Sequence, residues 1–568
     1  MRQRWPILTL AAAIVAATAL ILYLGRGQTA ASDQWAYIYA YQPWSLESLL
    51  TPHSGHLIVF PLIVYKAMFE AFGIESQVPY QLVNLALSAT TAVLLFALIR
   101  NAIGDLLALA AATLILFYGA GADVLISTSQ ITNLIGMASG LAMLLALRRE
   151  SLRFDLAACL SLAISISSFS IGVAFALGAA LALALRPPGN RLRRCWVVLA
   201  PIVLYAAWVI WSRKFHEQTI YVHNLKVLGS AFADQLSAAL SGITGLFTTP
   251  NGPKPDANPV PIRTTWGPAL VVGLVALLIV RFRRPPGPSR EALVAVTVLA
   301  AYFLLVGIAL NQFRNTFDTR LVYLGSILVL LAVAELCGPY RPTKLVAAIV
   351  GVVFVFSLCA NVAELGDSAQ LWRAQAAPIK AKLAAVEIAG EAASPPVLVE
   401  DPPGAMTFNV ETAHQLKADF GLPAYSEAEL KTGSPGDRQI ADEELARVFE
   451  IAPHPGAVLS SSSGRHGAVV ALSVTRGKAV RHGSCLTLLP AASKGEAVLR
   501  LPPGGMAFAS SSPVAVSLGR FGDTLAVSLP KRSGPTTVPI PADNSTVPWQ
   551  AGVTSAARTV VCPVAGPV

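Results

Sequence analysis

The sequence predicts a polytopic α-helical membrane protein of about eleven transmembrane helices, followed by a β-rich extracytoplasmic domain at the C-terminus. The 568 residues are 54% hydrophobic and only 13% charged, whereas an average soluble domain carries roughly a quarter charged residues. Apolar runs follow one another to about residue 365, and short alternating runs between turn residues replace them near the C-terminus. We therefore divide the chain into a transmembrane domain, 1–365, and a soluble domain, 366–568.

The transmembrane prediction depends on runs of about 20 mostly apolar residues, the length that crosses the hydrocarbon core. The first run follows Arg2 and Arg4, and its apolar core is too long for a signal peptide, which is the alternative. Two runs meet at residues 167–170, which favours a tight hairpin, with one long broken helix as the alternative. The predicted spans are 5–24, 79–99, 103–122, 131–147, 154–168, 170–185, 195–212, 267–282, 291–310, 321–337 and 343–362.

The loop charges predict the orientation, because positively charged short loops stay cytoplasmic. Alternate connectors carry arginines, which places the N-terminus in the cytoplasm and the C-terminal domain outside a plasma (inner) membrane. The apolar run 57–72 contains Pro61, Lys66 and Glu70, and a span there would invert every later loop. We predict a helix lying in the outer interface instead. These clustered arginines also account for the net charge of +10, so we expect the lipid bilayer as a partner and no nucleic acid.

The soluble domain is predicted to be α/β at first and sandwich-like afterwards. Trp372 to Ile388 has the composition of a surface helix, and the stretch 400–460 gives no firm assignment. From Gly467 onward, runs such as VVALSV, CLTLLP, EAVLRL, VAVSLG and TLAVSLP predict an antiparallel β-sandwich. Cys485 and Cys562 lie outside the apolar spans, so we expect a disulfide, with two buried free thiols as the alternative.

Candidate functional side chains occur in segments that are predicted to face outward. Asp33 follows the first span by a few residues, where a carboxylate can act as a general base toward a sugar hydroxyl or hold a cation on a phosphate. A helix-capping role is the alternative. His53 and His56 follow in PHSGH and suit a phosphate, a metal, or a cap on the helix that starts near Leu57. Two histidines without a third ligand are a weak metal signal.

Two later outer segments also carry polar candidates. Asp123 and Gln130 border the loop GADVLISTSQITN, and a helix cap is again the alternative for the aspartate. The segment NQFRNTFDTRLVYLG is basic on the side where arginine is unexpected, and a guanidinium suits bidentate phosphate binding. An arginine and aspartate pair that closes the loop is the alternative. This last segment carries Arg314, Asp318, Arg320 and Tyr323.

Motifs of several other protein classes are missing from the sequence. It contains no Walker-type phosphate loop, zincin helix, nucleophile elbow or dinucleotide fingerprint. The acidic residues of the apolar runs, Asp105, Asp155 and Glu335, lie near the ends of the runs. Ion-coupled transporters usually place ionisable groups near the bilayer midplane, so this pattern disfavours a transporter.

Several segments together resemble the GT-C superfamily of integral membrane glycosyltransferases, in particular a bacterial group. They are Asp33 after the first helix, HSGHLIVFPLIVYKAMFEAFG, SQITNLIGMASGLAMLLAL, SSFSIGVAFALGAALALAL and FDTRLVYLGSILVLLA, within residues 1–370. The resemblance implies transfer of a sugar from a polyprenyl-phosphate-linked donor to an extracytoplasmic cell-envelope glycan, lipid or protein acceptor. It also implies that Asp33 is the catalytic base and that Arg314 or Arg320 meets the donor phosphate.

The sequence departs from the pattern of this family at one position. Many members carry a second acidic residue beside the first, but Gln34 follows Asp33 here. Either Asp33 works alone or a distant group such as Asp123 completes the site, and a divalent cation, Mg or Mn, stays open as a cofactor. Two other functions remain as alternatives: a flippase or exporter of lipid-linked sugars, and a non-catalytic cell-envelope assembly protein.

Overall fold

The chain divides into two compact units in the computed structural model. The first comprises Met1–Phe72 and Gln77–Arg373, and the second comprises Gly73–Ser76 and Ala374–Val568. The connector arginines Arg2, Arg284 and Arg341 and part of the loop before residue 266 lie outside the described residues. The structure describes residues 4–30, 33–39, 44–217, 220–247, 266–283, 287–311, 314–338, 343–393, 398–400, 407–456, 467–522 and 524–564.

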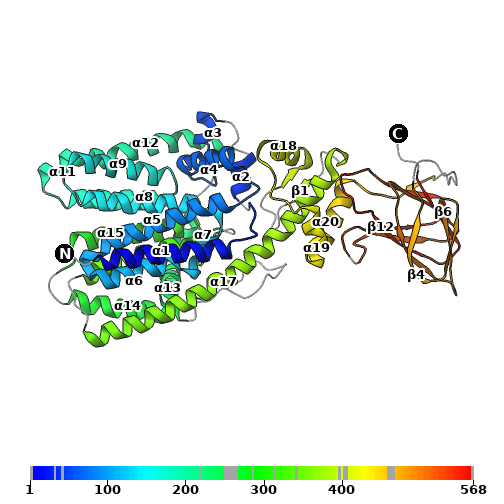
Figure 1. Ribbon diagram of the computed structural model, residues 1–568. Helices are drawn as coiled ribbons and strands as arrows, with labels where there is room; N and C mark the ends of the chain where they lie inside the picture. The colour runs from blue at the N-terminus through cyan, green and yellow to red at the C-terminus, as the bar shows by residue number, and fades with distance from the viewer. Residues whose placement is uncertain are drawn as a thin grey trace. The chain divides into compact units, whose positions relative to one another are not determined.

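The first unit is built from helices. In chain order they are α1 (Trp5–Leu24), α2 (Asp33–Tyr39), α3 (Leu46–Leu50), α4 (Val59–Phe72), α5 (Val78–Ile103), α6 (Asp105–Leu116), α7 (Ala122–Ile126), α8 (Ile131–Leu147), α9 (Leu152–Ile166), α10 (Ile171–Ala184), α11 (Pro188–Arg194), α12 (Trp196–Ser212), α13 (Leu228–Thr244), α14 (Gly267–Phe282), α15 (Arg290–Ile308), α16 (Thr319–Cys337) and α17 (Lys344–Ala389), of which the residues up to Arg373 belong to this unit. The long helices run side by side, with α2, α3 and α4 at one end of the bundle and α11 at the other (Figure 1).

These helices confirm the predicted class of multi-pass helical membrane protein. Among the described residues, seven helices are long and apolar enough to cross a membrane, and the pair of α6 and Gly119–Ile126, bent by 48°, makes an eighth if it is one span. Each of the eleven predicted runs forms a helix, but α10 and α14 are shorter apolar helices and α9 has only 15 residues. The predicted hairpin is present at residues 167–170, because α9 and α10 are separate helices that pack on each other rather than one broken helix.

One boundary prediction is wrong. The sequence predicted a last span at 343–362 and a separate helix from Trp372 to Ile388, but both belong to the single 46-residue helix α17. The stretch between them, residues 363–371, contains Glu364, Asp367, Ser368 and Gln370, and these polar residues end the apolar run. The stretch includes Ala, Glu, Leu and Gln, which are good helix formers, so the backbone stays helical. The predicted domain boundary at residue 365 therefore falls inside α17.

Close helix packing fixes the bundle on which the candidate site is built. The core of the first unit joins α5, α8, α10, α15 and α16, with fully buried side chains such as Leu95, Met137, Phe175 and Leu328. Gly140 in α8 lies against the ring of Phe175 in α10, where an added Cβ would come within 2.1 Å of a ring carbon. Small residues of this kind let membrane helices approach closely, so α8 and α10 are held in a defined register.

The second unit contains short helices and two larger antiparallel sheets, as predicted. The stretch without a sequence assignment forms α18 (Val410–Phe420), α19 (Glu427–Thr432) and α20 (Pro435–Val448), next to a pair of short strands, β1 (Leu398–Glu400) and β2 (Thr407–Asn409). One sheet has the order β10-β9-β12-β7-β4 and the other β3-β11-β8-β13-β6-β5. The strands are β3 (His454–Pro455), β4 (Val470–Arg476), β5 (Lys478–His482), β6 (Cys485–Leu489), β7 (Gly495–Arg500), β8 (Gly504–Ser510), β9 (Val514–Gly519), β10 (Val527–Arg532), β11 (Thr536–Ile540), β12 (Gln550–Ser555) and β13 (Thr559–Pro563).

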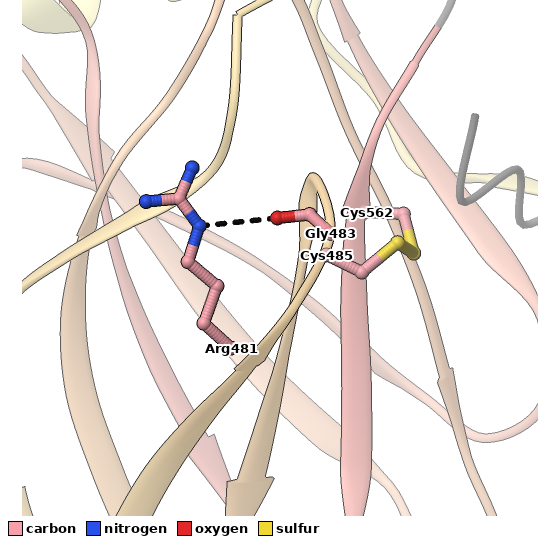
Figure 2. Close-up of a disulfide and its surroundings, with 4 residues drawn as sticks. All are labelled: Arg481, Gly483, Cys485 and Cys562. Atoms are coloured by element: carbon pink, nitrogen blue, oxygen red, sulfur yellow. Dashed lines mark hydrogen bonds between the residues drawn. A yellow bond between two sulfur atoms is a disulfide. The ribbon is translucent and has the colours of Figure 1, made fainter. Parts of the chain in front are cut away.

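A disulfide between Cys485 and Cys562 joins two neighbouring strands, β6 and β13, of the six-stranded sheet. Figure 2 shows this bridge beside the turn from β5 to β6, where Arg481 Nε donates a hydrogen bond of 3.1 Å to the carbonyl of Gly483. Burial alternates along β7, β9, β11 and β12, so each sheet has one covered face, as a sandwich requires. The structure thus has the disulfide rather than the two free thiols.

Candidate functional site

A tight turn places the two histidines of PHSGH. His53 and His56 exchange backbone hydrogen bonds of 3.1 and 3.0 Å, and the two residues between them, Ser54 and Gly55, have φ values of 50° and 73°. Two successive positive φ angles define a primed turn, which needs glycine or a residue that tolerates the left-handed region. This geometry makes the segment a fixed turn ahead of α4 rather than a loose loop.

Asp33, in the first turn of α2, meets this turn directly. Its Oδ1 lies 3.3 Å from Nε2 of His53, and its side chain keeps 41% of its surface exposed. Burial acts to raise the pKa of Asp33, but the hydrogen bond and charge of His53, followed by the charge of Arg320, bring it below the ordinary value. The carboxylate is therefore ionised at neutral pH and remains reachable from solvent. Its place in the first turn also suits the helix-terminus role that the sequence left open.

His56 connects the turn to two other segments. Nε2 of His56 lies 3.1 Å from a terminal nitrogen of Arg314, and Nδ1 lies 2.6 Å from Oγ of Ser170, in the turn between α9 and α10. A guanidinium can only donate, so Nε2 accepts and Nδ1 carries the proton that is donated to Ser170. Burial first, and then the charges of Arg314 and His53, lower the pKa of His56 to about 3. His56 is therefore a neutral acceptor that holds Arg314.

The two arginines lie at the start of α16, Arg314 in the connector before it and Arg320 in its first turn. Nε of Arg320 lies 2.8 Å from Oδ2 of Asp318, and Asp318 also accepts from the backbone N–H of Arg320 as the N-cap of α16. The arginine and aspartate pair considered from the sequence is thus present for Arg320, whereas Arg314 contacts His56. Burial and the charge of Arg320 lower the pKa of Arg314. Since arginine stays protonated at neutral pH, two guanidinium cations influence each other here, and an anion between them would be stabilised.

The remaining candidates lie beside this cluster rather than in it. The carboxylate of partly buried Asp123 accepts a hydrogen bond from the hydroxyl of Thr319, which ties α7 to the start of α16. The side chain of Gln130 is buried and bonds to Ser129 at 3.0 Å. Tyr323 is fully buried in α16, with its ring 6.0 Å from that of Tyr118. Asp123 is therefore near enough to the cluster for its charge to act on Arg320, whereas the contacts described for Gln130 and Tyr323 are made with other residues of the bundle.

Several supporting residues were missed by the sequence reasoning. The ring of Tyr37 packs 5.0 Å from that of His53 and 4.8 Å from that of Tyr65. The hydroxyl of Tyr65 donates to the backbone carbonyl of Thr128, in the short turn before α8. Ser170, the acceptor for His56, belongs to the connector 167–170, and nothing in the sequence indicates that its side chain contacts the site. Tyr37 follows Asp33 closely in the sequence and Tyr65 lies in the predicted interfacial helix 57–72, but only the fold brings the two rings together.

The site does not fit a resident divalent cation. Within the described ranges, no group of three or more His, Cys, Asp or Glu side chains could hold a metal ion. A cation placed at Asp33 would also meet the charge of Arg320, which acts on that carboxylate. We derive no step through a metal, and the Mg or Mn left open by the sequence stays a prediction.

The fold and the site define a multi-pass membrane protein with the partly exposed carboxylate of Asp33 near two arginines. No protein-family model matches this chain, and neither does any curated protein sequence. Among solved structures, the chain is similar to the crystal structure of ArnT from Cupriavidus metallidurans bound to undecaprenyl phosphate. The identity is 14% and the TM-score is 0.41, over 75% of this chain and 87% of ArnT. A TM-score of this size carries no argument, so function is inferred from the residues of the site.

Proposed function

We propose that this protein is a membrane glycosyltransferase of the GT-C type, which transfers a sugar from a polyprenyl-phosphate-linked donor to an extracytoplasmic cell-envelope glycan, lipid or protein. The observation that carries the proposal is the cluster of Asp33, Arg314 and Arg320 at one end of a bundle of apolar helices. A lipid-linked donor presents its phosphate at the membrane surface, where guanidinium groups can bind it. A carboxylate beside that phosphate can accept the proton of an acceptor hydroxyl.

The residues can divide the reaction between them. Asp33 accepts the proton of the acceptor hydroxyl as the hydroxyl oxygen forms a bond to the anomeric carbon of the sugar. The bond between that carbon and the phosphate oxygen breaks, and its electron pair leaves with the polyprenyl phosphate. Arg314 and Arg320 stabilise the charge that develops on the phosphate. His53 positions Asp33, and neutral His56 positions Arg314.

The orientation belongs to the same proposal. Arginines concentrate around α11, at the end of the bundle opposite α2, α3 and α4 (Figure 1), and the positive end of a membrane protein stays cytoplasmic. The disulfide between Cys485 and Cys562 supports an extracytoplasmic second unit, because such bridges persist in oxidising compartments. The site would then face the outside of the plasma (inner) membrane, with the N-terminus in the cytoplasm.

The test is the variant Asp33→Asn, with Asp105→Asn as its matched control. Asp105 also forms an ion pair, with Arg100, and its side chain is likewise 41% exposed, but it lies at the start of α6. We expect Asp33→Asn to lower sugar transfer by about 100-fold or more, the usual contribution of a general base. Asp105→Asn should keep its activity. Transfer is measured in proteoliposomes with a panel of labelled polyprenyl-phosphate-linked sugars and membrane extract as acceptor.

The same assay separates the two other functions. A flippase or exporter would move the labelled lipid across the bilayer without forming a new glycosidic bond. A non-catalytic assembly protein would keep its full effect in cells when a correctly folded Asp33→Asn variant replaces it. Full transfer by Asp33→Asn would remove Asp33 from the mechanism.

A further inference from the structure

A second cluster of charged residues lines a cavity in the first unit. The cavity has a volume of about 160 Å³ and lies among α5, α8, α10, α15 and α16. This is roughly ten times the space that one water molecule needs when measured in the same way. The charged side chains that line it are Arg148, Glu150, Arg186, Arg290, Glu291 and Glu335.

Hydrogen bonds hold the three arginines in place. Arg148, Arg186 and Arg290 each donate to a backbone carbonyl near the end of a neighbouring helix, at 2.7, 2.6 and 2.6 Å. Cations placed at helix C-termini satisfy carbonyls that lack a partner within the helix. The guanidinium groups are therefore fixed around the cavity before any ligand arrives.

The three glutamates of the lining balance the three arginines in number, but the ion pairs among the described residues do not include every arginine. Arg148 is paired with Glu335 at 2.5 Å, and Arg186 with Glu150 at 2.7 Å. In the described part of the chain, no ion pair includes Arg290, and Nε of Arg186 has no hydrogen-bond partner although its side chain is only 3% exposed. A buried donor without a partner costs free energy, so this atom favours an acceptor from a ligand.

The charges of two other arginines act on Arg186. Burial, followed by the charges of Arg194 and Arg290, lowers the pKa of Arg186, and the carboxylates of Glu150 and Asp155 do not compensate for this. An anion that enters the cavity would relieve this repulsion. A cation would increase it.

The cavity is distinct from the candidate glycosyltransferase site. Both lie along α16, with Arg320 near its first residue and Glu335 near its last. A separation of 15 positions along the helix corresponds to roughly 22 Å. This separation is comparable with the thickness of the hydrocarbon core, about 30 Å, so the two sites lie toward opposite leaflets.

We propose that the cavity binds an anionic phosphate group at the end of the bundle opposite Asp33, with Arg186 and Arg290 as its main ligands. Planar guanidinium groups bind phosphate through paired hydrogen bonds. Basic pockets between membrane helices on the cytoplasmic side are suited to lipid head groups. Free phosphate has the same chemistry, and the experiment separates the two sources.

The test measures binding to the full-length protein by native mass spectrometry. The protein is stripped of lipid in non-ionic detergent and incubated with phosphatidylglycerol, phosphatidylcholine or inorganic phosphate. We expect retention of phosphatidylglycerol over phosphatidylcholine, and about tenfold weaker binding in Arg290→Gln, the loss expected for one charge-assisted contact. Arg193→Gln is the matched control, because Arg193 is an exposed arginine of α11 at the same end of the bundle.

Each outcome has a defined meaning. Phosphatidylglycerol binding that depends on Arg290 supports a lipid head group, and equal binding of inorganic phosphate with the same dependence supports a free phosphate. Absence of binding to the unmodified protein with both probes overturns the proposal. Equal loss in Arg193→Gln overturns it as well, because binding would then depend only on net charge. If Arg290→Gln fails to fold, Arg290→Lys keeps the charge, and competition between phosphate and phosphatidylglycerol for the unmodified protein still decides.

Discussion

The contact between His53 and Asp33 makes a prediction about the pH dependence of the proposed transfer. In the folded protein, burial acts to raise the pKa of Asp33, and the hydrogen bond and charge of His53 are the largest influences that lower it. The variant His53→Asn removes these influences, so the pKa of Asp33 must rise. A general base works only when it is deprotonated, and the acidic limb of kcat/KM follows the pKa of the base in the free enzyme. The limb should therefore move to higher pH.

The size of the movement follows from the distance. His53 Nε2 and Asp33 Oδ1 are 3.3 Å apart, and Asp33 is 41% exposed, so the dielectric constant of water is the suitable limit. Coulomb's law then gives about 1.3 kcal/mol for two unit charges. One pKa unit corresponds to about 1.36 kcal/mol, so we expect a shift of about one pH unit.

Two assays can measure this shift. The first is the pH profile of kcat/KM for sugar transfer, and the second is the infrared carboxyl band of Asp33, isolated by subtracting the spectrum of Asp33→Asn. His223→Asn is the control, because His223 is an exposed histidine of the same unit. An unchanged limb in His53→Asn, or one that moves to lower pH, would refute the role of His53 in holding the base ionised.

Three further predictions concern other parts of the molecule. Replacing Cys485 and Cys562 by serine should destabilise the six-stranded sheet by about 4.5 kcal/mol, from the closure entropy of a loop with a sequence separation of 77, and faster hydrogen exchange in β6 and β13 would show it. Asp442→Asn should lower the free energy of unfolding by about 2 kcal/mol, because buried Asp442 accepts backbone N–H bonds from the segment after β9. Asp419 is exposed, so Asp419→Asn should change the thermal unfolding little. Sugar transfer should survive EDTA, and loss of activity that Mg or Mn restores would show that the proposed reaction needs a metal.

The location of the site could be predicted from loop charges alone. Alternating arginine-rich connectors sent Asp33, His53 and Arg314 to one side of the membrane before any contact was known. The contacts themselves could not be predicted in this way. Arg314 and His56 are separated by 258 positions, and their hydrogen bond depends on how the connector after α15 reaches the turn before α4. Side-chain pairing across such a separation is determined by helix packing, which hydropathy does not encode.

Helix ends were predicted less well than helix positions. Hydropathy predicts a helix end at residues 363–371, inside α17, because hydropathy reports contact with lipid and not backbone conformation. The runs that form the β-sandwich were predicted well, since one face of each strand is covered and burial alternates with a period of two. Gly73–Ser76 belongs to the second unit although it lies between α4 and α5 in the chain, and no pattern in the sequence indicated this.

The glutamine that follows Asp33 decides what kind of carboxylate chemistry the site can support. Gln34 is fully buried; it donates to Gln77 at 3.1 Å and accepts from Thr128 at 3.0 Å. An acidic residue there could still accept from Thr128, but it could not donate to Gln77 and would bury a charge. Asp123, the other carboxylate proposed to complete the site, is partly buried and accepts from a threonine hydroxyl. Asp318 forms an ion pair with Arg320 and its side chain is 14% exposed, whereas that of Asp33 is 41% exposed. Asp33 is therefore the candidate carboxylate that we propose as the base. A single carboxylate beside guanidinium groups suits a base that acts on a bound phosphate ester better than a carboxylate pair that holds a metal.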